Sequence, residues 1–95
     1  SLDPLVRGLT VSSLDLRTPR LRLPLDETLR RAVTGRRVVA TSRRGKYLLL
    51  HLDDAKAWIF HMGMSGRLRF VAGAVHAGTH DHVVAGFDGG GALVF

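Results

Sequence analysis

Two short segments of the chain carry side chains suited to gripping a nucleic acid. The first, Arg43–Lys46, places three cations just before the apolar run Tyr47–Leu50. The second, His61–Gly66, places the long thioether side chain of Met64 in a glycine-containing turn. Cations contact phosphates, and a thin apolar side chain on a closely approaching loop can enter a base stack. These residue types indicate a protein that binds DNA and inserts a side chain between bases.

The cations also have a simpler interpretation. Lys46 follows a glycine and is predicted to open a strand, which would hold a point charge beside a phosphate. A lysine at a sheet margin can instead be solvated and only discourage association between sheets. Arg43 and Arg44 have forked donors that match phosphate oxygens, but adjacent arginines also occur in ordinary charged turns. The residues alone leave both interpretations open.

Met64 likewise has two interpretations. Gly63 and Gly66 flank it closely, so the turn can approach the backbone of another molecule. A methionine there could fill the space left by an ejected base and offset part of the cost of ejection. It could equally pack as a core residue. Met62, within an apolar strand pattern, is predicted to belong to the core.

The pair His80 and His82 could contact a phosphate, simply line a polar face or bind a metal, and the metal is the least favoured of the three. In a strand, His80 and His82 would lie on one face and Asp81 on the other. A metal would need a third or fourth ligand, and the chain contains no cysteine. A nearby phosphate would favour protonated imidazole and raise its pKa. His51 and His61 are predicted to be strand side chains with local hydrogen-bond partners.

The composition favours an anionic partner. The 95 residues include 14 Lys or Arg against 8 Asp or Glu, a formal net charge of +6, and every Lys and Arg precedes Phe70. Such an excess is typical of proteins that bind nucleic acid, a membrane surface or an acidic protein. No apolar run is long enough to span a bilayer, and the first residues show no secretory signal. The absence of cysteine excludes a disulfide framework within these residues.

The periodicity of the apolar residues predicts a mainly β domain. Helical patterns cover Ser1–Gly8 and Asp26–Thr34, with Asp26 as the N-cap and Gly35 just beyond the C-terminus. Strand patterns, with a period of two, cover Leu9–Leu16, Arg17–Pro24, Arg37–Ser42, Lys46–Leu52, Ala57–Met62, Arg67–Val71, Asp81–Phe87 and Ala92–Phe95. Because most connections are short, the strands are expected to form an antiparallel sheet or sandwich.

Four motifs, in order and at close to the expected spacing, resemble the amino-terminal domain of the formamidopyrimidine-DNA glycosylase family (Fpg, also called MutM). They are Gly35–Val39, Arg43–Leu50, His61–Leu68 and His80–Val83. The resemblance covers most of the chain and is strongest from Gly35 to Phe95. The sister endonuclease VIII branch shares the fold, but its equivalent of the Met-Ser-Gly turn usually differs.

The resemblance implies a β-sandwich of two antiparallel sheets with short flanking helices over residues 1–95. It implies that the parent protein is a bacterial cytoplasmic enzyme of base-excision repair. That parent protein is expected to be a monomer. Members of the family remove oxidised purines, such as 8-oxoguanine and formamidopyrimidines, from damaged double-stranded DNA and nick the abasic strand by β,δ-elimination. No membrane partner is implied.

The resemblance also implies roles for individual residues. Lys46 matches the lysine that contacts phosphates around the flipped lesion. Met64 matches the residue that enters the vacated space in the duplex, and His80 matches a histidine that contacts the DNA backbone. Further backbone contacts are expected from Arg43, Arg44 and Arg67.

Other parts of the family pattern have no counterpart in these residues. The family's nucleophile is an amino-terminal proline followed by glutamate, whereas Pro4 is internal and its amide nitrogen cannot form a Schiff base. The helix–two-turn–helix element and the zinc finger are also missing, so zinc is expected only in the remainder of the parent protein and no cofactor in this chain. We therefore expect a domain truncated at both ends and inactive alone. The alternatives are a non-catalytic nucleic-acid-binding module of the same fold, an endonuclease VIII-like glycosylase, or a structural domain.

Overall fold

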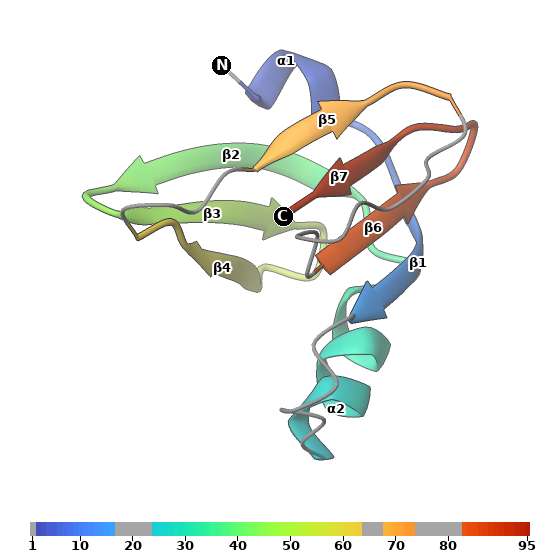
Figure 1. The fold of residues 1–95 in the computed structure, drawn as a ribbon, viewed down its shortest axis with the longest axis horizontal. Helices are drawn as coiled ribbons and strands as arrows, with labels where there is room; N and C mark the ends of the chain where they lie inside the picture. Colours follow the sequence, from blue (N-terminus) through green and yellow to red (C-terminus); the bar gives the residue numbers. More distant parts are fainter. Residues whose placement is uncertain (1, 17–23, 64–67, 74–82) are drawn as a thin grey trace.

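The computed structural model describes residues 2–16, 24–63, 68–73 and 83–95, which form two antiparallel sheets and two helices (Figure 1). One sheet has the strand order β1-β6-β7-β5, and the other has the order β2-β3-β4. The elements, in chain order, are α1 (Asp3–Val6), β1 (Val11–Leu16), α2 (Pro24–Val33), β2 (Val38–Arg44), β3 (Tyr47–Leu52), β4 (Ala57–His61), β5 (Arg69–Val71), β6 (Val83–Phe87) and β7 (Ala92–Val94). The predicted β-sandwich is confirmed.

Buried and exposed side chains alternate along the strands, and the buried ones form the core between the sheets. In β4, Trp58 and Phe60 are buried, whereas Ile59 between them is 55% exposed. Successive side chains of a strand point to opposite faces, so this pattern turns one face of the sheet inward. Leu50 of β3 and Leu93 of β7 are buried in the same apolar cluster. Burial of this shared face holds the two sheets together.

Two segments that follow the helices, residues 8–11 and 35–38, run antiparallel and join one sheet to the other. The Gly8 N–H donates to the Val38 carbonyl at 2.7 Å, and the Val38 N–H donates to the Leu9 carbonyl at 2.8 Å. The first segment continues into β1 and the second into β2. The backbone hydrogen bonds between them therefore fix one end of the sandwich.

The second helix begins earlier than the sequence predicts. Asp26 is not its N-cap, because α2 already begins at Pro24. Proline suits the first helical position, where its missing N–H has no intrahelical partner and its φ is already helical. The predicted terminator is confirmed, since Gly35 has a φ of 86° just beyond the last helical residue. Of the predicted edge strand Arg17–Pro24, residues 17–23 lie outside the described residues and Pro24 belongs to α2.

Two substitutions in neighbouring strands test which face of the β2-β3-β4 sheet is buried. Leu50→Ala removes a fully buried side chain and is expected to lower the free energy of unfolding by about 2–5 kcal/mol. Ile59→Ala, on the exposed face, is expected to change it by less than about 0.5 kcal/mol. Urea denaturation followed by circular dichroism measures both, and similar losses for the two variants would contradict the assignment.

Candidate nucleic-acid interface

The cations predicted to bind phosphates lie at the turn between β2 and β3. Arg44 pairs with Tyr47 across the hairpin, which leaves Gly45 and Lys46 as a two-residue turn. Gly45 has a φ of 58°, as the first central position of a type II′ turn requires. The sequence predicts that Lys46 is the first residue of the strand, and this prediction is wrong. Lys46 lies at the tip of the hairpin, because the pairing of Arg44 with Tyr47 makes it the second residue of the turn.

The backbone of this turn is anchored to the end of β4. The Met62 N–H donates to the Lys46 carbonyl oxygen at 2.7 Å. Met62 is half-buried and packs against the core cluster, as predicted. Gly63 follows with a φ of 57°, and Met64 comes next in the sequence but lies outside the described residues. The main chain at Lys46 is therefore fixed, while its side chain is exposed.

Arg43, Arg44 and Lys46 are all exposed, and none has an ion-pair partner among the residues that the structure describes. Several other arginines differ, because they pair with carboxylates of the same chain. Cations without an internal partner keep their charge and hydrogen-bond donors free for an external anion.

His61 also belongs to this surface, although the sequence predicted only a local role for it. It pairs directly with Tyr47 across β3 and β4, and the centroids of the two rings are 5.0 Å apart. Both side chains are exposed beside the turn. The pairing of β3 with β4 was the signal that could have located His61 there. We define the hairpin patch as Arg43, Arg44, Lys46, Tyr47 and His61.

The local partner predicted for His51 is confirmed. Its Nε2 lies 2.7 Å from the Ser42 Oγ, within hydrogen-bonding distance. His51 lies between Leu50 and Leu52, whose side chains are buried, so its ring points to the opposite face of the sheet. No carboxylate among the described residues is hydrogen-bonded to His51 to complete a catalytic triad. The pair therefore satisfies the imidazole and does not form a nucleophile site.

A hollow of about 430 Å³ lies behind the patch, with Asp3 of α1 and Arg43 of β2 in its lining. Asp3 accepts hydrogen bonds from the Arg7 Nε at 2.7 Å, from the Thr41 N–H at 2.6 Å and from the Thr41 hydroxyl at 3.0 Å. The bond from Arg7, followed by the backbone bond from Thr41, lowers the pKa of Asp3 from 3.8 to about 2. An acid this strong stays ionised at neutral pH and is unsuited to general acid–base chemistry there. Asp3 instead ties α1 to β2.

The remaining predicted site residues, Met64, Arg67 and His80, lie outside the described residues. Within the described ranges, no group of three or more His, Cys, Asp or Glu side chains could hold a metal ion. In the same ranges no helix has the length and apolar character needed to cross a membrane.

The comparisons with known proteins agree on one family. The model of the formamidopyrimidine-DNA glycosylase N-terminal domain matches residues 1–95. The formamidopyrimidine-DNA glycosylase of Azorhizobium caulinodans is 42% identical over 106 residues, which cover 99% of this chain and 36% of that protein. The enzyme of the same name from Teredinibacter turnerae is 47% identical over 73 residues, covering 77% of this chain and 27% of that protein.

Solved structures give the same result. Lactococcus lactis Fpg (MutM) in complex with FAPY-dG-containing DNA superimposes with a TM-score of 0.86 and 31% identity, covering 98% of this chain and 35% of that one. The Lactococcus lactis enzyme bound non-covalently to DNA containing an AP site gives a TM-score of 0.85, with the same identity and coverage. The chain thus spans about a third of the length of the relatives it matches.

The hydrogen bonds of Asp3 predict a specific pH dependence of stability. Because its pKa is lower in the folded protein than its ordinary value of 3.8, its contribution to the free energy of unfolding is present above about pH 4 and is lost as the pH falls through about 2. Asp3→Asn should lower stability at pH 7 and flatten the decline between pH 4 and 2.

Thermal unfolding of both proteins across this pH range measures the effect. Asp88→Asn, at an exposed position in the turn between β6 and β7, is the matched control. A decline in the Asp3→Asn variant as steep as in the unmodified protein would show that Asp3 is not the responsible group.

Proposed function

Because the chain belongs to the formamidopyrimidine-DNA glycosylase family, we propose that the protein carrying it is a base-excision-repair glycosylase with AP-lyase activity. Its substrate is double-stranded DNA damaged by oxidation, from which it removes purine lesions such as 8-oxoguanine and formamidopyrimidine. The observation that carries the proposal is the hairpin patch. Its cations have no internal ion-pair partner among the described residues, and they lie at the end of β2 and in the turn that follows, whose backbone accepts a hydrogen bond from Met62. The relatives solved with FAPY-dG and AP-site DNA support it.

In this proposal the hairpin patch holds the DNA backbone. The Lys46 ammonium contacts a phosphate, and the guanidinium groups of Arg43 and Arg44 each offer paired donors to neighbouring phosphate oxygens. His61 stands beside Tyr47 and adds a ring nitrogen that can donate a hydrogen bond to a phosphate oxygen. The hydrogen bond between Met62 and Lys46 keeps the turn in place when the phosphate is bound.

Met64 is assigned the role of the wedge. It follows Gly63, so the segment that leaves β4 beside Lys46 leads directly to it. An unbranched apolar side chain can occupy the space left when a base is flipped out, which offsets part of the cost of unstacking. Arg67 and His80 extend the contacts to the DNA backbone. The support for these three residues is the order and spacing of their motifs.

The chemistry is assigned to residues outside this chain. Pro4 is internal, so its nitrogen is an amide and cannot form a Schiff base, and the hydrogen bonds of Asp3 keep its carboxylate ionised. We expect the 95 residues to be inactive alone. The parent protein is proposed to act as a monomer in the bacterial cytoplasm, with its zinc in a separate zinc finger.

The salt dependence of DNA binding tests the role of Lys46. Lys46→Met keeps most of the side-chain length but removes one phosphate contact, so the slope of log affinity against log salt should become shallower by about 0.9. Lys56→Met removes the same charge at the other end of β4 and should leave the slope unchanged.

Fluorescence anisotropy with a duplex that contains an abasic-site analogue, measured across a salt series, gives both slopes. Equal slopes for the two variants would mean that the cations act only through net charge, and would contradict a contact made by Lys46 itself.

A further inference from the structure

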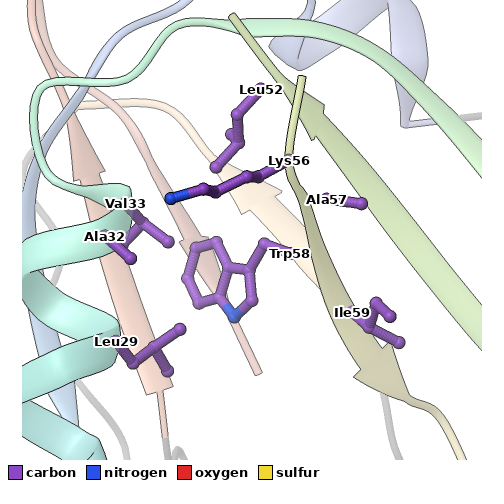
Figure 2. A pocket seen from close by; sticks show the side chains of 8 residues that line it. All are labelled: Leu29, Ala32, Val33, Leu52, Lys56, Ala57, Trp58 and Ile59. Carbon is purple, nitrogen blue, oxygen red and sulfur yellow. The ribbon is translucent and has the colours of Figure 1, made fainter. Parts of the chain in front are cut away.

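His61 is the last residue of a strand at the margin of its sheet, on the face turned away from the core. Among the described strands, β4 has a neighbour only on the side of β3. The indole of Trp58 points from β4 towards α2 in Figure 2. Because side chains alternate along a strand, His61 lies on the opposite face, where it is exposed. An imidazole in this place depends on its cross-strand neighbour to hold it.

The register places Tyr47 against this imidazole. The Met62 N–H donates to the Lys46 carbonyl, so the next pair along the two strands, Tyr47 and His61, is one without mutual backbone hydrogen bonds. Side chains approach each other most closely in pairs of this kind. The two ring centroids are 5.0 Å apart, and the ring planes are inclined at 58°. The Tyr47 ring is therefore in direct contact with the imidazole.

Within the described ranges, neither ring nitrogen of His61 has a hydrogen-bond partner. His51 differs, because its Nε2 lies 2.7 Å from the Ser42 Oγ. On the other side of His61, a Cβ placed on Gly63 would lie 3.9 Å from the His61 Nδ1 and Cε1, so the ring lies beside a residue that has no side chain. The contact with Tyr47 can thus orient the imidazole while its nitrogens stay available to an external acceptor.

The core does not account for Tyr47. Its side chain is 48% exposed, and it belongs neither to the buried cluster nor to the side chains packed against that cluster. Its place on the surface is nevertheless fixed, because β3 is the central strand of its sheet and Tyr47 pairs with Arg44 on one side and His61 on the other. Tyr47 therefore supplies a firmly placed ring against which the neighbouring imidazole rests.

We propose that Tyr47 is a positioning residue, whose ring holds the His61 imidazole in the orientation in which it meets a phosphate of the bound DNA. The inference rests on the function proposed above, and it assigns to Tyr47 no contact with the DNA. A side chain that is already ordered binds more tightly, because less conformational entropy is lost when the complex forms. This role requires an aromatic ring at position 47 and does not require the tyrosine hydroxyl.

A cycle of substitutions separates positioning from direct contact. Tyr47→Leu should bind the duplex with an abasic-site analogue about threefold to tenfold more weakly, whereas Tyr47→Phe keeps the ring and should retain most of the affinity. In a His61→Ala background, the change of Tyr47 to Leu should have no further effect, since there is then no imidazole to hold. Ile59→Ala removes an exposed apolar side chain from the same face and is the control, with unchanged affinity. Fluorescence anisotropy at one salt concentration measures all of these variants.

NMR spectra of the free chain measure the ring contact without DNA. The His61 ring-proton resonances, identified by their loss in His61→Ala, should move in Tyr47→Leu towards the values of an unstructured peptide, because the ring current of Tyr47 is removed. In Tyr47→Phe they should stay close to their positions in the unmodified chain.

Several results would overturn the positioning role. An equal loss of affinity from Tyr47→Leu with and without His61 would show that Tyr47 touches the DNA itself. Unchanged binding by Tyr47→Leu, or a loss in Tyr47→Phe as large as in Tyr47→Leu, would also contradict it. Failure of the unmodified chain to bind the duplex would overturn the proposed function and this inference together, whereas unchanged His61 resonances in Tyr47→Leu would overturn this inference alone.

Discussion

The backbone hydrogen bonds between residues 8–11 and 35–38 are the constraint on which the rest of this structure depends. They join the start of β1, an edge strand of one sheet, to the start of β2, an edge strand of the other. The same two segments also accept hydrogen bonds from two turns. The Asp88 N–H donates to the Thr10 carbonyl at 2.9 Å, and the Asp53 N–H donates to the Arg37 carbonyl at 3.0 Å. Buried backbone groups must be paired, so these bonds both satisfy the junction and fix the relative placement of the sheets.

The opposite end of the β2-β3-β4 sheet carries the hairpin patch, which is the proposed DNA-binding surface. There the β2–β3 turn projects Lys46, and the hydrogen bond from Met62 is the link that ties the turn to β4. This arrangement combines a rigid main chain with exposed charged side chains, which suits contact with a phosphate backbone. The strand β4 begins at Ala57 and ends in the hairpin patch at His61.

The sequence predicted the elements better than their ends. Alternation of apolar residues identified the strands, because burial of one face requires a period of two. It could not decide whether Lys46 ends the turn or opens the strand, since that depends on the pairing of Arg44 with Tyr47. The start of α2 was missed because Asp26 is a common N-cap residue, whereas the structure begins the helix at Pro24. The place of His61 in the patch depends on strand pairing, which periodicity does not reveal.

The central claim is that this domain recognises damaged DNA through the hairpin patch and Met64. The most direct test is fluorescence anisotropy of the 95-residue chain with a duplex containing one abasic-site analogue and with its undamaged twin, over a range of salt concentrations. The account predicts tighter, salt-dependent binding to the damaged duplex and loss of that preference in Met64→Ala. Equal binding to the two duplexes by the unmodified chain would contradict it.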